Sequence, residues 1–361
     1  MTGEVRALAL AHYAQQQAAA VRAAARVRDL WQRIDSRRIS GSWQQLAPLL
    51  VAAVTDAQRE AAALADPYVG AVVEAEDADP TPAGRVRPAA FAGIASDGRP
   101  LVSLLYQPII DWKVRMLAGQ SVDDAFRGSL ASALRITATQ VADAGRGATG
   151  AAMAGRRTIQ GYVRVVQPPA CARCIILAGT EYGWNKGFQR HPRCDCIHLP
   201  TTLIARNQHR RGSLSTDDFN PTTRPGSGGR GFLDPRSYFD SLSAAEQRRV
   251  FGEAGARAIR EGADMASVVN ARRGMTTMTA YGRSVQATTE GATRRGAFHR
   301  LERTRTEAQT GTRFARDRIE AQQGLPRFEL RTPRLMPEEI YRLAESRDEA
   351  IAMLRRFGYL T

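Results

Sequence analysis

All four cysteines of this 361-residue chain lie between residues 171 and 196. Cys171 and Cys174 are separated by two residues, and His191 and Cys194 repeat that spacing further along. Two intervening residues let a pair of ligands turn back onto one tetrahedral ion, as in structural zinc sites. Thiolates and imidazole are ligands that suit Zn²⁺. The spacing therefore predicts a structural zinc ion that holds a small module in shape where the apolar core is thin.

The segment offers more ligands than one zinc ion needs. The preferred set is Cys171, Cys174, His191 and Cys194. Cys196 is a close alternative, because alternate residues of a strand face the same side and it would therefore lie beside Cys194. His198 continues the same alternation. Spacing alone does not select which four of these six residues bind the metal.

Other roles of the cysteines stay open. An even number of cysteines could form two disulfides outside the reducing cytosol. A redox-active C-x-x-C pair needs an exposed thiol, whereas Ile175, Ile176 and Leu177 indicate burial. Catalytic zinc needs an open coordination position and a general base, and Glu181 and Asp195 are the nearby carboxylates. We therefore expect a structural metal and no enzymatic activity.

The chain around this segment is predicted to be mainly α. Residues 1–73 should form a helical hairpin, since residues 5–35 lack Gly and Pro and Ser42 can cap a second helix with Pro48 near its first turn. Trp31 is expected to be a packing anchor, as is Trp43, whereas His12 and His299 are expected to lie at the surface. The predicted fold is a long helical N-terminal part, a small zinc-stapled α+β module, and a helical and extended C-terminal extension.

Changes in composition along the chain predict the boundaries of the next three segments. An acidic, Pro-rich loop precedes a helical segment, together covering 74–160, in which Ser121 should begin a helix. Residues 161–202 form the Cys/His module, which starts with a strand pattern at 160–166. Residues 203–232, dense in Gly, Pro, Ser and Thr, are expected to be a linker.

Residues 233–361 are predicted to be a basic helical C-terminal extension. Ser243 and Glu246 form a capping box for a helix over 243–260. Pro337 should begin another helix, and Ser346 should cap the last one. The segment 271–318 is rich in arginine and poor in large apolar residues, so we expect it to cover a partner instead of forming its own core.

The net charge is +15, and more than half of it lies in residues 203–361. Such a balance favours polyanions or acidic protein surfaces as partners. The candidate contact residues are Arg272, Arg273, Arg294 and Arg295. The N-terminus lacks the pattern of a signal peptide, and no stretch approaches the ~18 apolar residues of a membrane span. A soluble protein made in the cytoplasm is therefore expected.

The C-x-x-C pair followed by HPRCDC resembles the Mu F-like minor capsid, or head morphogenesis, proteins of tailed bacteriophages. Two later stretches are similar to the C-terminal extension of the actinobacteriophage branch of that family: SYFDSLSAAEQRRVFGEAGARAIREGADMASVVNARRGM and LMPEEIYRLAESRDEAIAMLRRFGYL. The resemblance covers about 160–360 and, more loosely, 1–160. The motif residues that it carries over are Cys171, Cys174, His191, Cys194 and Cys196.

The resemblance implies a non-enzymatic virion protein inside the capsid near the portal, assembled in the host cytoplasm and acting in head assembly or genome delivery. Its implied partners are the portal protein, the major capsid protein and packaged double-stranded DNA, with no membrane. The four arginines named above become candidates for contact with DNA or portal. Two alternatives stay open: a metal-dependent enzyme acting on nucleic acid, which needs a metal with a bound water, and a zinc-stabilised DNA-binding protein, which needs sequence-selective binding.

Overall fold

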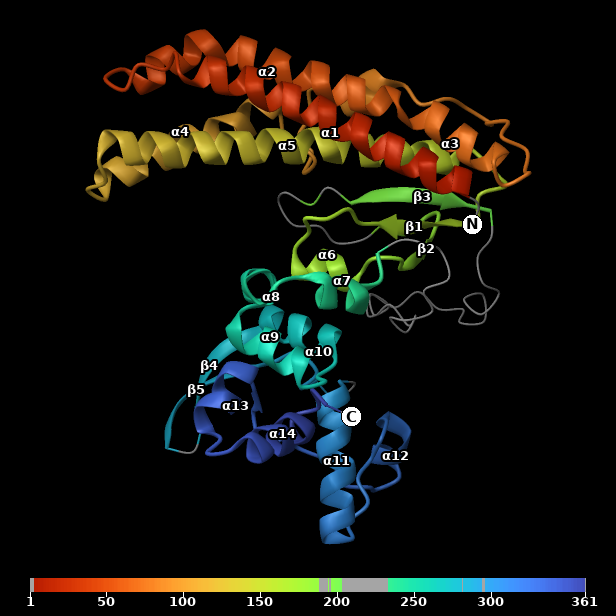
Figure 1. Cartoon of the computed structure of the whole chain (residues 1–361), viewed down its shortest axis with the longest axis vertical. Helices are drawn as coiled ribbons and strands as arrows, with labels where there is room; N and C mark the ends of the chain where they lie inside the picture. Colours follow the sequence, from red (N-terminus) through yellow and green to blue (C-terminus); the bar gives the residue numbers. More distant parts are fainter. Residues whose placement is uncertain are drawn as a thin grey trace. The chain divides into compact units, whose positions relative to one another are not determined.

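The computed structural model describes residues 3–187, 194, 196–202, 233–280, 282–293 and 296–360. Helices dominate these residues, and the strands form two small antiparallel sheets (Figure 1). The mainly α fold class predicted from sequence is confirmed. The chain divides into two compact units: residues 1–168 with 177–233, and residues 234–361 with 169–176. The predicted linker, 203–232, lies outside the described residues.

Helices packed around one long central helix make up most of the first unit. They are α1 (Gly3–Trp31), α2 (Ile39–Ala63), α3 (Ala65–Glu74), α4 (Leu101–Leu117) and α5 (Val122–Ala154). α1, α2 and α4 run alongside α5 (Figure 1). Buried alanines let these helices approach closely, and Trp31, Trp43 and Trp112 fill the remaining space. The two tryptophans predicted to be packing anchors are confirmed as such.

The predicted hairpin over 1–73 contains a third helix. α2 ends at Ala63 and α3 starts at Ala65, because Pro67 has no N–H with which to continue the ladder of hydrogen bonds. The prediction that Ser42 caps α2 is wrong: the helix starts at Ile39, and the Ser42 hydroxyl donates to the carbonyl of Arg38 at 2.9 Å. Pro48 consequently lies inside α2.

Two histidines predicted to be at the surface are buried. His12 is 3% exposed, and its ring stacks on Tyr68 of α3 with a centroid distance of 3.8 Å. His299, in the second unit, is 6% exposed and meets the ring of Phe328 edge-on at 5.1 Å. Each prediction failed because a segment distant in sequence covers the helix face that carries the histidine.

α5 begins where the sequence predicts. The hydroxyl of Ser121 accepts a hydrogen bond from the N–H of Asp124 at 3.1 Å, and Asp123 and Asp124 place negative charge in the first helical turn. Between α3 and α4, the acidic and Pro-rich stretch contains a short 3₁₀ helix, η1 (Pro88–Phe91). α5 is 33 residues long and contacts both the other helices of the first unit and strand β3.

The first sheet has the strand order β2-β1-β3, with β1 (Gly161–Val165) paired antiparallel to β2 (Glu181–Gly183) and β3 (Ile197–Thr201). The strand predicted at 160–166 is confirmed. All five residues of β1 are buried. Val163 and Leu199 share a hydrophobic cluster with Val69 and Val72 of α3, so the sheet packs on the helices instead of standing apart from them.

The second unit contains short helices and the other sheet, ordered β4-β5-β6. Its elements are α6 (Ala172–Ile176), α7 (Pro235–Ser241), α8 (Ala244–Phe251), α9 (Glu253–Arg260), α10 (Met265–Ala271), η3 (Arg272–Gly274), β4 (Met275–Ala280), β5 (Arg283–Thr288), α11 (Ala297–Thr310), α12 (Arg318–Gln322), β6 (Arg334–Leu335), α13 (Pro337–Leu343) and α14 (Arg347–Arg356).

The helix predicted over 243–260 is divided in two. The capping box of Ser243 and Glu246 is present, but Gly252 adopts φ +75° and ends α8. A side chain at that position would be strained by the backbone and would also meet the guanidinium of Arg272. The predicted helix starts at Pro337 and Ser346 are confirmed.

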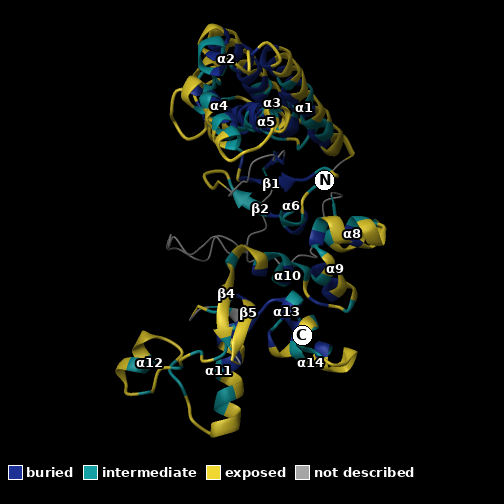
Figure 2. Ribbon diagram, turned by 90° about the vertical axis from the view of Figure 1, so that its left-hand side faces the viewer, coloured by how far each residue is buried: buried dark blue, intermediate teal, exposed yellow. Residues whose placement is uncertain are grey.

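The arginine-rich segment 271–318 forms part of a core, contrary to the prediction that it only covers a partner. Val285, Ala287 and Phe298 are each no more than 1% exposed. In β4, by contrast, the residues from Met275 to Thr279 are exposed and Ala280 is half-buried, and the strand is mostly yellow in Figure 2. Within the described part of the chain, no helix is both long enough and apolar enough to cross a membrane.

Candidate metal centre

Three cysteines form a buried group. Cys174 lies on α6, and Cys194 and Cys196 precede β3; their sulfur atoms all lie within 4.8 Å of one another. Such a group could hold a metal ion. Sulfur ligands favour Zn²⁺ among the common structural metals, and three of them leave one tetrahedral position for a fourth ligand.

The pair Cys194 and Cys196 lies at the start of β3. Ile197, the next residue, pairs with Val165 of β1. The two sulfurs lie 3.5 Å apart, well beyond the ~2.05 Å of a disulfide bond, and all four cysteines of the chain are present as thiols. The two side chains point to the same place, as the i, i+2 spacing predicts.

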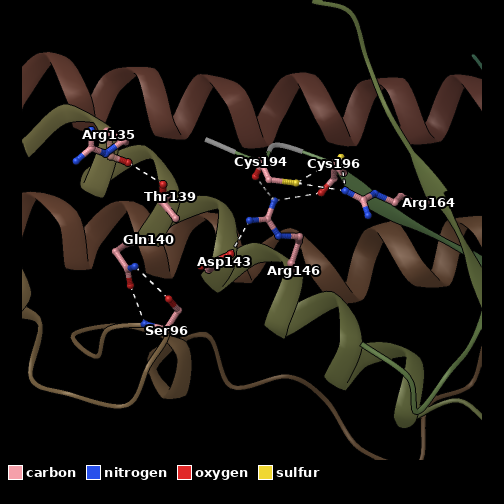
Figure 3. A network of polar contacts seen from close by, with 9 residues as sticks. All are labelled: Ser96, Arg135, Thr139, Gln140, Asp143, Arg146, Arg164, Cys194 and Cys196. Carbon is pink, nitrogen blue, oxygen red and sulfur yellow. Dashed lines mark hydrogen bonds and ion pairs between the residues drawn. The ribbon is translucent and has the colours of Figure 1, made fainter. Parts of the chain in front are cut away.

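Arg146 of α5 holds the backbone of this pair. Its Nη1 donates to the carbonyl oxygens of Cys194 at 2.8 Å and Cys196 at 3.1 Å (Figure 3). Its Nη2 pairs with the carboxylate of Asp143, one turn earlier on the same helix, at 2.5 Å. Both charged side chains are almost fully buried. The ion pair therefore fixes the direction of the guanidinium toward the two carbonyls.

Arg164 approaches the same pair from β1. Its Nη2 lies 3.6 Å from Sγ of Cys194 and 3.4 Å from Sγ of Cys196 (Figure 3). The residue is 1% exposed. Its backbone N–H donates to the carbonyl of Thr180 at 2.9 Å, which anchors the strand beside the sulfurs. A buried cation at this distance stabilises negative charge on the sulfur atoms.

The remaining predicted ligands lie elsewhere. Cys171 is exposed and outside the buried group, and its sulfur accepts the N–H of Cys174 at 3.4 Å, the contact expected of a C-x-x-C turn. His191 lies outside the described residues, as does Asp195. The ring of His198 lies 4.3 Å from that of Tyr162 and lines a small cavity beside His12.

Of the arginines predicted to contact DNA or portal, Arg272 and Arg273 lie in η3. Arg272 forms an ion pair with Glu338 at 2.9 Å, so part of its charge is used within the second unit. Arg294 and Arg295 lie outside the described residues.

Sequence reasoning missed the two arginines that surround the cysteine pair. One signal was available for Arg164, because it is the charged residue at the centre of the otherwise apolar run YVRVV. A charge in the middle of a buried strand requires a partner. Arg146 carries no comparable signal, since it lies in a helix among Ala, Gly and Asp.

Comparison with models of protein families, with curated proteins and with solved structures finds no match to this chain. The fold and the buried thiols define a mainly α protein with a group of cysteines that could hold a metal ion.

Proposed function

We propose that this chain is a structural protein of a tailed-bacteriophage head, of the Mu F-like minor capsid type, in which a zinc ion stabilises the cysteine segment. The observation that supports the proposal most is the buried group of Cys174, Cys194 and Cys196. It lies in the same segment whose C-x-x-C and HPRCDC pattern carries the resemblance.

The zinc ion is bound by these three thiolates and by a fourth ligand, Cys171 or His191. A tetrahedral ion with four protein ligands has no open position for water or substrate, so its role is structural. The chain is accordingly proposed to have no enzymatic activity. Zinc binding contributes directly to folding free energy when the metal-free segment cannot hold its shape.

The proposed location is inside the capsid near the portal, after assembly in the host cytoplasm. The partners are the portal protein, the major capsid protein and packaged double-stranded DNA, and the role is in head assembly or genome delivery. The net charge of +15 supports contact with DNA or with acidic protein surfaces. Arg272, Arg273, Arg294 and Arg295 are the proposed contact residues.

Elemental analysis of the purified protein and co-purification from infected cells test the two parts of the proposal. We expect one zinc ion per chain, and we expect the protein in heads and in complex with portal protein. Cys171→Ser and His191→Ala form a matched pair: the variant that loses zinc identifies the fourth ligand. A metal-free wild-type protein would contradict the zinc site, and a protein found only as a free monomer during infection would contradict the virion role.

A further inference from the structure

We propose that Arg164 and Arg146 are positioning residues of the cysteine site, which act through the sulfurs and the backbone, respectively, of Cys194 and Cys196. The inference rests on the proposed zinc site and adds a function for two residues outside the ligand motif. Both arginines belong to the same compact unit as this cysteine pair.

Arg164 offsets the charge of the bound metal. Zinc with three thiolates carries a net charge of −1, and with four thiolates −2. Burying such a charge is unfavourable unless an opposite charge and hydrogen bonds accompany it. The Nη2 of Arg164, at 3.6 and 3.4 Å from the two sulfurs, supplies both.

Arg146 fixes where the sulfurs lie. It donates from one nitrogen to both cysteine carbonyls and is itself held by Asp143. Because α5 is a long, packed helix, the anchor is rigid, and the strand start cannot move without breaking two hydrogen bonds to a buried charge. Arg146 thus restricts the conformations open to the two cysteines, and less ordering remains for metal binding to supply.

Arg156 provides a matched control within the same unit. Like Arg146, it is 5% exposed, and it forms an ion pair with Asp66 at 3.0 Å. It also donates to the carbonyls of Pro80 and Ala152. It has the size, burial and charge of the two positioning arginines, but its hydrogen bonds join helices and loops instead of the cysteines.

The test compares Arg164→Met, Arg146→Met and Arg156→Met in the full-length protein. Zinc affinity is measured by competition with a chromogenic chelator, and the absorption spectrum is recorded with Co²⁺ in place of zinc. Loss of an outer contact to a metal ligand lowers metal affinity by about 10- to 100-fold, and we expect this for Arg164→Met and Arg146→Met. Arg156→Met should retain wild-type affinity under conditions in which circular dichroism shows it folded.

The cobalt spectrum separates the two roles. Hydrogen bonds to sulfur lower the energy of its donor electrons, so Arg164→Met should move the sulfur-to-cobalt charge-transfer band to lower energy. Arg146→Met should leave the band in place, since Arg146 contacts carbonyls. Arg164→Lys keeps the charge with a different donor geometry and should give an intermediate affinity and a smaller shift of the band. These two measurements test the role of Arg164 if Arg164→Met does not fold.

The outcomes distinguish this inference from the proposed function. If the wild-type protein binds zinc and all variants match it in affinity and in cobalt spectrum, the positioning role is wrong and the zinc site stands. If Arg156→Met loses as much affinity as the other two, the effect is general destabilisation and the inference is overturned. If the wild-type protein binds neither zinc nor cobalt, the metal site and this inference fail together.

Discussion

The helical layer of the first unit and the sheet beside it are stabilised in different ways. α1, α2, α4 and α5 share a core of tryptophan, leucine, valine and many alanines. Local sequence pattern produces such helices, and burial of their apolar faces stabilises the layer. The stability of the helical layer therefore comes mainly from apolar contacts among its own helices.

Besides its apolar contacts with α3, the sheet is held by polar side chains from α3, from the turn that follows α3 and from α5. The hydroxyl of Tyr68 donates to the carbonyl of His198 at 3.0 Å, and the carboxylate of Glu76 accepts from the N–H of Thr202 at 2.7 Å and the hydroxyl of Thr201 at 3.1 Å. Arg146 adds its two bonds at the other end of β3. The sheet takes its position from the helices, so destabilisation of the helices should also destabilise the sheet, whereas loss of the sheet should leave the helices folded.

Metal removal should give the largest effect and only in one region. Apparent binding free energies of structural zinc in small peptides are about 10–16 kcal/mol, which is comparable to the whole stability of a domain. We expect a chelator to abolish hydrogen-exchange protection over 161–202 while the helices over 3–154 stay protected. The same treatment of a Cys194→Ser variant serves as the control and should change nothing further. Equal protection of 161–202 with and without chelator would remove the distinction between the regions.

Truncation of Trp31 should affect the helical layer next most strongly. The side chain is 1% exposed, its indole N–H donates to the hydroxyl of Ser129 at 3.2 Å, and its ring lies 6.1 Å from that of Trp43. Trp31→Ala should lower the free energy of unfolding by about 3–5 kcal/mol. Urea denaturation measures the loss, and Val21→Ala, at a position 65% exposed on the same helix, should stay within about 0.5 kcal/mol of wild type. Similar losses in both variants would contradict a core built on Trp31.

The sequence predicts the parts of the fold that short-range physics determines. The caps at Ser121, Ser243 and Ser346 were predicted correctly, because a hydroxyl followed three residues later by an acidic residue satisfies the free N–H groups of a helix start. Burial of His12 and His299 was missed, because the covering residues, Tyr68 and Phe328, lie far away in the chain.

In the candidate site, too, the sequence predicts the residues that local spacing identifies and misses those that only the tertiary fold brings close. The C-x-x-C and C-x-C spacings identify the cysteines as candidate metal ligands, because the spacing of such ligands is visible in a short stretch of sequence. The sequence does not identify Arg146 and Arg164 as their neighbours, because α5 and β1 meet the cysteine pair only through the tertiary fold. Spacing also favoured Cys171 over Cys196, whereas the buried group contains Cys196.

The pH dependence of stability tests the contact between α1 and α3. Burial lowers the pKa of His12 from 6.5 to about 4. The unfolded chain therefore binds a proton more readily than the folded protein between these values. The stability contributed by neutral His12 is complete above pH 6.5 and is lost as the pH falls toward 4, by about 3 kcal/mol in total.

The matched variant is His12→Phe, which retains a ring to stack on Tyr68 but cannot titrate. Urea denaturation between pH 4 and 7 should give a shallower loss of stability for this variant than for wild type, after the shared titration of carboxylates is subtracted. Parallel curves for the two proteins would show that His12 is accessible to protons in the folded state.

Removal of the α5 cap should give the smallest effect and should separate the two ends of that helix. Ser121→Ala leaves the N–H of Asp124 without its side-chain acceptor and should lower the free energy of unfolding by about 1 kcal/mol. Arg146 lies 25 residues further along α5, about seven helical turns away. Fraying of the first turn should therefore leave zinc affinity unchanged, because the packed middle of the helix still holds Arg146 in place. A fall in zinc affinity that matches the loss of stability would instead mean that the helical layer and the cysteine segment unfold as one cooperative unit.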